Sequence, residues 1–447
     1  MLVRNGKLED VVECTRRILN DPWYDRLTKR VIVYKGVPFW VVDDSFVPEW
    51  HMSKVNYDSD DKRMPKDDTQ LMKWIGREIG EDLPIDRPLW KITVLENFRK
   101  CDDGSGDFIS CVVLRVHHVL ADGVSLMSML NSMMTTQSEL EAIKSNRPVP
   151  PRGHMSPLVN KIHPRPWLLA LYAAMYALPV LLGHAISRSD VNPFKTQHVE
   201  GKKVVGMLHD TIDIKKIKAV KNRLGMSIND VLMGVLGAAC HRVWAKLDGV
   251  EGADSFLAAI PVNMRAGTER SVFNNLNAAI VLPVPTDSAD PFVACEKIKL
   301  TLDYYKRHPI VYVNFLCMLT MMRLFPAHLV RMIIEFMTNK TTAVVSNVPG
   351  PTEIMFMGDK QIESLGFWAP QVGTSSFGVT LVSIGGKLSV GCILDAGASD
   401  KSQLLCDEYR AAFNDLEKIV LEGETMPIKE CNRDDGSLAT QANVQMP

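Results

Sequence analysis

Two adjacent histidines, followed at a fixed distance by an aspartate and a glycine, are the residues of this chain best suited to chemistry. They lie in the heptapeptide His117-His118-Val119-Leu120-Ala121-Asp122-Gly123. An unperturbed imidazole has a pKa of about 6.5, so a histidine can take a proton from a hydroxyl group near neutral pH without further tuning. One of the two histidines could therefore take a proton from an attacking hydroxyl group, a step that acyl-transfer chemistry can use.

The residues around this heptapeptide predict the elements that position it. Segment 109–116 is short and rich in β-branched residues, which indicates a largely buried strand that ends at the histidines. Successive side chains of a strand point to opposite faces, so we expect only one of His117 and His118 to face the reaction cleft. Asp122-Gly123 fits a turn, where the carboxylate accepts hydrogen bonds and the glycine permits a positive φ or a close backbone approach. A helical pattern follows.

Two other interpretations of these histidines remain open on this segment alone. Paired histidines at a strand end are often ordinary core or surface residues. Histidine and aspartate are also common zinc ligands, but neighbouring strand histidines diverge, and neither a CxxC pair nor an HExxH helix supplies further ligands. We therefore predict no metal site.

Four further motifs accompany the heptapeptide along the chain. In order, they are Arg87-Pro88-Leu89-Trp90, Ser227-Ile228-Asn229-Asp230-Val231, Pro261-Val262-Asn263-Met264-Arg265 and Ser346-Asn347-Val348-Pro349-Gly350-Pro351. Together with the HHxxxDG signature, they resemble the wax ester synthase/acyl-CoA:diacylglycerol acyltransferase family. That family is a branch of the superfamily of CoA-dependent acyltransferases and peptide-synthetase condensation domains, and the resemblance runs from about Leu8 to about Leu421.

The resemblance implies roles for the residues of the heptapeptide. His118, the second histidine, is expected to be the general base, and His117 to support it. Asp122, followed by Gly123, is expected to be mainly structural and to pair with an arginine that shapes the turn. We predict that this arginine is Arg265.

The other motifs supply candidates for positioning the substrate or supporting the site: Trp90, Asn229, Asp230, Arg265 and Asn347. Trp90 is either a plug in the protein core or part of the lining of a substrate tunnel. Ser227 is a natural N-cap, so Asn229 and Asp230 are expected in the first helical turn, with a structural or a substrate-positioning role. Asn347 follows a predicted strand at 342–345, and its amide could donate a hydrogen bond to a developing oxyanion.

The 447 residues are enough to bury two substantial cores, because single domains usually contain about 100 to 200 residues. The resemblance implies an α/β (α+β) fold of two chloramphenicol-acetyltransferase-like lobes, with a mixed sheet in each and the active site in a tunnel between them. We predict a first lobe at 1–150, a proline-rich crossover at 151–200, a second lobe at 201–425 and a polar tail at 426–447. Members of the family usually begin with a further strand that this N-terminus does not predict, which indicates an abbreviated start and an incomplete edge of the first sheet.

Hydrophobic periodicity predicts individual elements in both halves. Helices are expected at 8–19, 69–79, 217–224 and 231–247, and one amphipathic helix in the methionine-rich region 310–337, where Arg331 and Glu335 are spaced for an i,i+4 pair. Strands are expected at 31–34, 39–42, 90–95, 256–260 and 278–283, and a hairpin at 378–383 and 388–395.

A long uncharged segment points to a lipid environment or to a buried crossover. No residue between Arg165 and Arg188 carries a formal charge, and 167–182 is apolar or aromatic, close to the roughly 20 residues of a spanning helix. Pro179 and His184 speak against a span, whereas Trp167 and the nearby tyrosines suit a headgroup boundary. Segment 166–187 is therefore either a membrane-contacting helix or a crossover helix buried between the lobes.

Composition adds two expectations. The formal net charge of −1 offers no global attraction to nucleic acid, so no nucleic-acid partner is predicted. Nine cysteines without a dense framework indicate reduced thiols, and the first ten residues lack a secretory signal. With the resemblance, these observations predict cytosol-facing association with the endoplasmic reticulum or a lipid droplet. The basic stretch 215–223 either contacts the phosphates of coenzyme A or is a solvated helix face.

The resemblance implies an O-acyltransferase that moves a fatty acyl group from acyl-CoA to a long-chain fatty alcohol or to diacylglycerol, with acyl-CoA as substrate and no cofactor. His118 would take the hydroxyl proton while the alkoxide attacks the thioester. No GxSxG element predicts an acyl-enzyme, so direct transfer is favoured. The alternatives are a condensation-type enzyme that forms amides or esters on other acceptors, and a catalytically silent lipid-binding or membrane-interaction protein.

Overall fold

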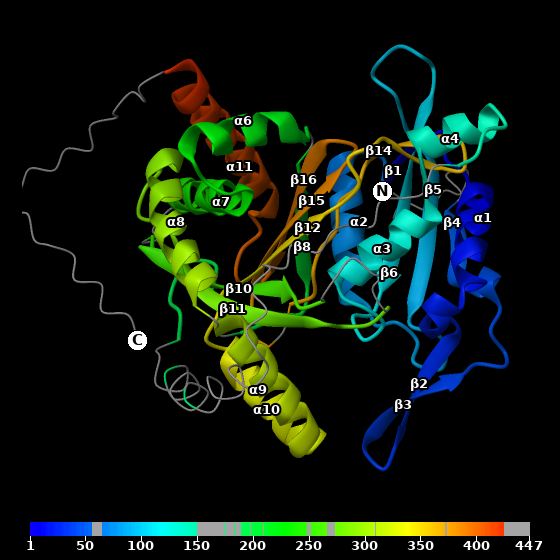
Figure 1. The fold of residues 1–447 in the computed structure, drawn as a ribbon, viewed down its shortest axis with the longest axis horizontal. Coiled ribbons are helices and arrows are strands. Elements are labelled where there is room, and N and C mark those ends of the chain that lie inside the picture. The colour runs from blue at the N-terminus through cyan, green and yellow to red at the C-terminus, as the bar shows by residue number, and fades with distance from the viewer. Residues whose placement is uncertain are drawn as a thin grey trace, which may run out of the picture.

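The protein has two lobes, each built around a mixed β-sheet (Figure 1). The computed structural model describes residues 1–55, 65–149, 189–196, 198–208, 210–247, 252–265, 273–308, 310–371 and 373–423, together with Met175 and Gly183. Two predicted segments lie outside the described residues: the polar tail, and the apolar helix at 166–187 except for Met175 and Gly183. The α/β fold with two lobes and mixed sheets agrees with the prediction.

The sheet of the first lobe has seven strands. Their order is β4 (Met52–Val55), β5 (Trp90–Lys100), β6 (Phe108–Val116), β1 (Leu2–Arg4), β14 (Lys360–Ser364), β13 (Met355–Met357) and β7 (Thr135–Thr136). β4 and β5 are parallel, and the other neighbours are antiparallel. Helices α1 (Leu8–Leu19) and α3 (Gly123–Met133) pack against this sheet in one apolar core, and α4 (Gln137–Lys144) follows α3.

Strand β1 corrects the expectation that the first sheet lacks a strand at its N-terminal edge. Leu2 lies opposite Cys111 of β6 and Ser364 of β14, so β1 is a central strand that joins two parts of the sheet. Three residues are too few to show a period of two, and β1 depends on hydrogen bonding with neighbours on both sides. The sheet also crosses the predicted lobe boundary, because β13 and β14 come from the second half of the chain.

Helix α2 (Asp68–Gly80) lies between the lobes. Its Leu71 and Ile75 share a core with Leu95 of β5 and with Val205 from a strand of the second lobe. A Cβ added to Gly76 would lie 2.4 Å from the backbone oxygen of Lys203, so only a glycine allows this close approach.

The sheet of the second lobe also has seven strands. Its order is β11 (Asn277–Pro285), β10 (Ser255–Asn263), β12 (Ala343–Pro349), β15 (Phe377–Ile384), β16 (Lys387–Asp395) and β8 (Lys203–Met207), and β9 (Ile212–Asp213) pairs with β16. β12 is parallel to both β10 and β15. Four helices pack in or around the core of this lobe: α6 (Ile214–Leu224), α7 (Ile228–Trp244), α8 (Pro291–Arg307) and α11 (Ser402–Glu417).

Helix α7 is the centre of the second core and is buried along most of its length. A Cβ on Gly237 would lie 2.1 Å from the backbone oxygen of Pro285, so α7 touches the end of β11 directly. In the part of the chain that the structure describes, no single helix is both long and apolar enough to cross a membrane. α6 and α7 together pass that test, but they are bent by 98° and α7 is largely a core helix.

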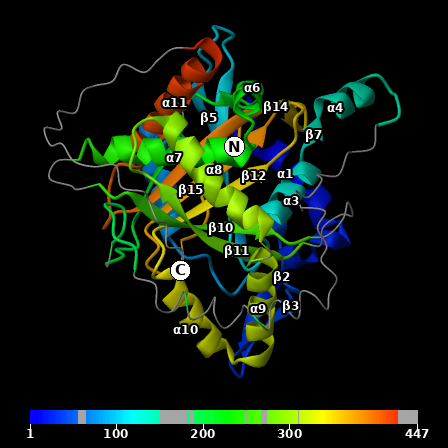
Figure 2. The ribbon, with the colours of Figure 1, turned by 60° about the vertical axis from the view of Figure 1, so that its left-hand side comes forward.

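The predicted amphipathic helix at 310–337 is in fact two helices, α9 (Ile310–Leu324) and α10 (Ala327–Thr338). The break falls at Phe325-Pro326, where proline cannot donate a helical hydrogen bond. The predicted pair within α10 is present, with Arg331 Nε 2.7 Å from Glu335 Oε1. α9 and α10 project from the second lobe, and the hairpin of β2 (Lys29–Tyr34) and β3 (Val37–Val42) projects from the first (Figure 2).

The other predicted elements are confirmed, with bounds that differ by a few residues at several ends. The helix predicted at 8–19 spans the same residues in the structure. The strand predicted at 90–95 extends to Lys100, because β5 keeps pairing with β6 beyond an irregularity between Leu95 and Arg99.

Candidate active site

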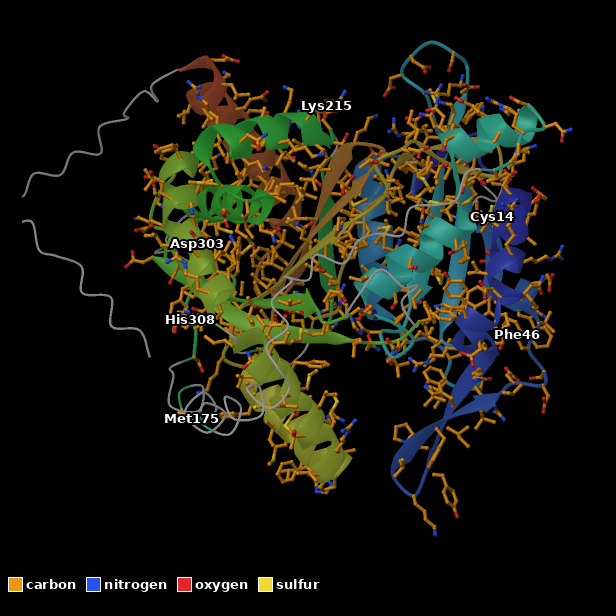
Figure 3. All side chains as sticks on the ribbon, in the orientation of Figure 1. Cys14, Phe46, Met175, Lys215, Asp303 and His308 are labelled. Carbon is orange, nitrogen blue, oxygen red and sulfur yellow. The ribbon has the colours of Figure 1, made fainter. Side chains whose placement is uncertain are left out.

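A cavity of about 1600 Å³ lies between the two lobes and collects most of the predicted site residues. Its wall includes His117, His118, Asp122, Gly123, Asn229, Arg265 and Asn347. Two candidates, Trp90 and Asp230, do not line it. Figure 3 shows the side chains of both lobes on the ribbon, in the orientation of Figure 1.

Much of the cavity wall is apolar. Helix α2 contributes Leu71, Met72, Ile75 and Ile79, α3 contributes Leu126, Met127 and Leu130, and the second lobe adds Met233, Ile280 and Leu302. Both lobes therefore present hydrocarbon to the same space, which suits a ligand with long alkyl chains.

Both histidines line the cavity, which corrects the expectation that only one faces it. β6 ends at Val116, so strand alternation does not apply to the next two residues. The His117 backbone N–H donates to the Leu89 carbonyl at 3.0 Å, and the His117 carbonyl accepts from the Leu120 N–H at 3.0 Å. The histidines thus belong to a turn, where successive side chains are free to point the same way.

The two imidazole rings differ in their hydrogen bonds. The Val119 backbone N–H donates to His117 Nδ1 at 3.2 Å, so the His117 ring is engaged with its own turn and its neutral form carries the proton on Nε2. Within the described ranges, the His118 ring has no hydrogen-bond partner, and only its backbone carbonyl is held, by Asn275 Nδ2 at 2.8 Å. His118 is therefore the histidine whose ring is available to a substrate.

Asp122 fixes the turn that carries the histidines. It is the N-cap of α3, and its Oδ1 accepts from the Ser125 N–H at 3.0 Å. Its Oδ2 accepts from Arg265 Nη1 at 2.9 Å and from the Leu276 N–H at 2.8 Å. The predicted Asp122–Arg265 pair is confirmed, and both side chains are buried, at 4% and 7% exposure.

Arg265 uses its second nitrogen to hold further groups around the same turn. Nη2 donates to Ser125 Oγ at 2.8 Å and to the Asn274 carbonyl at 2.7 Å, and Nη1 also donates to Asn263 Oδ1 at 3.1 Å. Segment 273–276, between β10 and β11, thereby reaches from the second lobe to the histidine turn. Ser125, Asn274 and Asn275 were not predicted to belong to the site; their only signal in the sequence is a polar side chain near a motif.

Gly123 serves close packing and does not adopt a positive φ. A Cβ at this position would lie 3.1 Å from Val348 Cγ2 of β12. The start of α3 therefore packs against the strand that also carries Asn347.

Asn347 and Asn229 meet at the cavity wall. Asn347 Nδ2 donates to Asn229 Oδ1 at 2.8 Å, which joins β12 to the first turn of α7. A carboxamide has two amide hydrogens, so the second hydrogen of Asn347 Nδ2 is left to donate to a ligand in the cavity.

Asp230 has a structural role, as its neighbour Ser227 indicated. Ser227 is the N-cap of α7, and Ser227 and Asp230 form a reciprocal capping box, with the Ser227 N–H donating to Asp230 Oδ2 at 2.7 Å. The remaining oxygen of the buried carboxylate accepts from Lys306 Nζ at 3.0 Å. Lys306 itself lines the cavity.

Trp90 is a core residue and does not line the tunnel, so the first of its two interpretations is correct. It is 3% exposed, donates from Nε1 to the Leu27 carbonyl at 2.7 Å and stacks on His51 at 4.6 Å between ring centroids. Trp90 supports the site indirectly, because its backbone pairs with Val116 at the end of β6.

The basic stretch 215–223 forms α6, which lies away from the cavity at the top of the second lobe, where Lys215 is labelled (Figure 3). Lys216 pairs with Glu417 at 2.9 Å. This placement fits a solvated helix face and does not fit contact with a ligand in the cavity. Among the described residues no cluster of three metal-ligating side chains occurs, and the eight cysteines they include are free.

Family models match most of the chain. The wax ester synthase/diacylglycerol acyltransferase catalytic domain matches residues 6–232, and the C-terminal domain of the same family matches residues 274–417. A putative diacylglycerol O-acyltransferase of Mycobacterium tuberculosis is 25% identical over 382 residues, covering 80% of this chain and 72% of the relative. Wax ester synthase/diacylglycerol acyltransferase 10 of Arabidopsis thaliana is 23% identical over 443 residues, covering 86% and 83%.

Solved structures share the two-lobed fold. The wax ester synthase/diacylglycerol acyltransferase from Marinobacter aquaeolei VT8 aligns with a TM-score of 0.61 at 19% identity, over 93% of this chain and 92% of that one. The first condensation domain of the CDA synthetase aligns with a TM-score of 0.54 at 14% identity, over 94% and 90%. These similarities support the fold, and the family models, which cover more than half of the chain, show that the protein belongs to the wax ester synthase/diacylglycerol acyltransferase family.

Proposed function

We propose that the protein transfers a fatty acyl group from acyl-CoA to the hydroxyl group of a lipid alcohol, either a long-chain fatty alcohol or diacylglycerol. The observation that carries this proposal is the His118 ring, which lines a largely apolar cavity and has no hydrogen-bond partner among the described residues. Family membership supports the reaction type.

In the proposed reaction, His118 removes the proton of the acceptor hydroxyl, and the oxygen attacks the thioester carbonyl carbon. The tetrahedral intermediate then collapses, the carbon–sulfur bond breaks, and coenzyme A leaves as a thiolate that takes up the proton held by His118, which restores the neutral imidazole. An imidazole is the side chain most often used for such a proton transfer. His117, whose Nδ1 is engaged by the Val119 N–H, supports the shape of the turn.

The second amide hydrogen of Asn347 is a candidate donor to the oxyanion of that intermediate. Asn229 accepts the first one and so orients the amide. Asp122 and Arg265 act through structure, because both are buried and bonded to the turn that carries His118.

Cavity size and lining support two long substrates at once. A volume of about 1600 Å³ exceeds the roughly 300 to 1000 Å³ of ordinary small-molecule pockets. A ternary complex of acyl donor and lipid alcohol would fill such a space, and direct transfer between them needs no acyl-enzyme. Substrates of this kind reside in membranes and lipid droplets, so we place the protein at a cytosol-facing lipid surface, such as the endoplasmic reticulum or a lipid droplet.

The test is an assay with purified full-length protein, palmitoyl-CoA and either hexadecanol or diacylglycerol. Released thiol and extracted lipid are followed together, since thiol without ester would indicate hydrolysis alone. We expect stoichiometric thiol and ester with at least one acceptor, and the ratio of the two rates gives the preferred alcohol. Absence of ester with both acceptors, or an amide formed only with amine acceptors, would contradict the proposal.

A further inference from the structure

Two apolar projections extend from the same side of the molecule. One is the β2–β3 hairpin of the first lobe, and the other is the α9–α10 pair of the second lobe; both point downward in Figure 1 and still do so after the rotation in Figure 2. The rotation is about the vertical axis, so both views show the two projections at the lower side of the molecule. We call the exposed side chains of these two projections the docking surface.

The hairpin carries large apolar side chains on both of its faces. Val33, Tyr34, Val37 and Phe39 are 70%, 60%, 51% and 48% exposed. Val33 and Tyr34 are adjacent on one strand and therefore point to opposite faces. A two-stranded ribbon is at best marginally stable in water, and apolar residues on both faces gain most by entering a non-aqueous phase.

The helical projection is apolar yet poorly buried. Only Val313 of the 15 residues of α9, and only Val330 of the 12 residues of α10, are buried. Five large apolar side chains at and beyond the helix turn are exposed: Met322, Leu324, Phe325, Met332 and Phe336. Helix α7 has a comparable composition but is buried in the core, so composition alone does not explain the exposure of α9 and α10.

The docking surface is also positively charged. Residues 29–42 and 310–338 contain five lysines and arginines and one acid, Glu335, whereas the whole chain has a formal net charge of −1. The basic residues are Lys29, Arg30, Lys35, Arg323 and Arg331, and of these Lys29 pairs with Asp25 and Arg331 with Glu335. Apolar side chains interspersed with basic ones complement a surface of anionic headgroups over hydrocarbon.

The helical projection is continuous with the substrate cavity. Val311 at the start of α9 and Thr338 at the end of α10 line the cavity, and Asn314 of α9 donates to the Ala279 carbonyl of β11 at 3.0 Å. A lipid layer that covers the docking surface would thus adjoin the cavity wall.

We propose that the docking surface inserts into the headgroup region of a bilayer that contains anionic phospholipid. Both projections would contact the bilayer together, and the cavity between their lobes would lie close to its surface. The use of such a site rests on the proposed function, since a lipid alcohol would enter from the bilayer. The binding itself is measured without turnover.

The test is flotation of the full-length protein with phosphatidylcholine vesicles, with and without phosphatidylserine. We expect binding that is stronger with phosphatidylserine. Val33→Asp and Leu324→Asp should each weaken vesicle binding by about tenfold or more. Each variant places a charge where an apolar side chain, exposed in the free protein, would be buried in the bilayer. Their combination should reduce binding further, since the two projections bind one surface.

The matched control is Ile143→Asp, on α4 at the opposite end of the molecule (Figure 1). Ile143 is 59% exposed, comparable with the two test residues, and its substitution should leave vesicle binding unchanged. Equal loss in all three variants, or no loss in either test variant, would overturn the proposal. So would a parent protein that dimerises through these residues, which light scattering of parent and variants would reveal.

Activity on a soluble, short-chain alcohol without vesicles separates this proposal from the proposed function. Neither Val33 nor Leu324 lines the cavity, so both variants should retain the parent rate there. Vesicle binding by a parent protein that is inactive with every alcohol would leave the docking surface intact and refute the proposed function. Full activity, together with vesicle binding that Val33→Asp and Leu324→Asp do not change, would refute the docking surface and leave the proposed function intact.

Discussion

Arg265 Nη1 lies 2.9 Å from Asp122 Oδ2, and this buried ion pair joins the two lobes directly beside the histidine turn. Arg265 follows β10 of the second sheet, whereas Asp122 caps α3 in the first lobe. The same guanidinium holds Ser125 and the Asn274 carbonyl, so it connects the two sides of the cavity through several bonds. The position of His118 therefore depends on contact between the lobes.

Arg265→Ala should destabilise the protein by about 3 to 5 kcal/mol, because it leaves the Asp122 carboxylate buried without its cation. Arg265→Lys should recover part of this loss, since lysine keeps the charge but cannot bond two groups in a fixed fork. Urea unfolding measures both, and acyl transfer should fall along with stability.

The exposed pair Arg331–Glu335 is the matched control. Its side chains are 80% and 45% exposed, and Arg331→Ala should cost no more than about 0.5 kcal/mol. Equal effects of Arg265→Ala and Arg331→Ala would show that the buried pair has no special structural role.

His118→Ala should lower the acyl-transfer rate by about 10²- to 10⁴-fold, the usual cost of losing a general base. Its side chain is exposed and its ring has no hydrogen bond among the described residues, so the melting temperature and circular dichroism should not change. His117→Ala should have a smaller effect on the rate, through loss of the bond from the Val119 N–H. A folded His118→Ala variant with the parent rate would remove His118 from the mechanism.

The sequence predicted the parts of the site that rest on local chemistry. Ser227 as an N-cap follows from its side-chain type next to a helical pattern, and it is confirmed. The turn predicted at Asp122-Gly123 is instead the start of α3, with Asp122 as its N-cap and Gly123 as its first residue. The Asp122–Arg265 pair came from the resemblance, because the two residues are 143 positions apart. Local patterns cannot locate such a contact.

Other features needed three-dimensional information. β1 has three residues, too few to show a hydrophobic period. It forms by pairing with β6 and β14, which lie far from it in the sequence. The histidines line the same cavity because β6 ends at Val116, as predicted, so the alternation of side chains along a strand does not extend to His117 and His118. Asn274 and Asn275 act through a connection between strands, where no periodicity exists to mark them.

Asn347→Ala tests the oxyanion role. If Asn347 stabilises the tetrahedral intermediate, kcat should fall by about 10²- to 10³-fold with little change in KM. Asn229→Ala removes the group that orients the Asn347 amide and should have a smaller effect in the same direction. Turnover of Asn347→Ala within a few-fold of the parent would leave only the structural link between β12 and α7.

His51 should make stability depend on pH without touching the cavity. Burial lowers its pKa below the ordinary value of 6.5, although its bond to the Trp90 carbonyl, with Nδ1 at 2.8 Å, acts in the opposite direction. On acidification, His51 of the unfolded chain therefore binds a proton near pH 6.5, whereas His51 of the folded protein binds it only at a lower pH. This contribution to stability is fully present above that pH and is lost as the pH falls through the lower folded pKa.

His51→Asn removes the titration and keeps a donor near the position of Nδ1, so it isolates this effect. Urea unfolding across about pH 5 to 8 should show a steeper decline on acidification for the parent than for the variant, with the two curves parallel above pH 7. The difference between the curves cancels carboxylates that titrate in both proteins. Curves that stay parallel down to pH 5 would mean that the folded protein accommodates a charged His51 beside Trp90 as readily as the unfolded chain does.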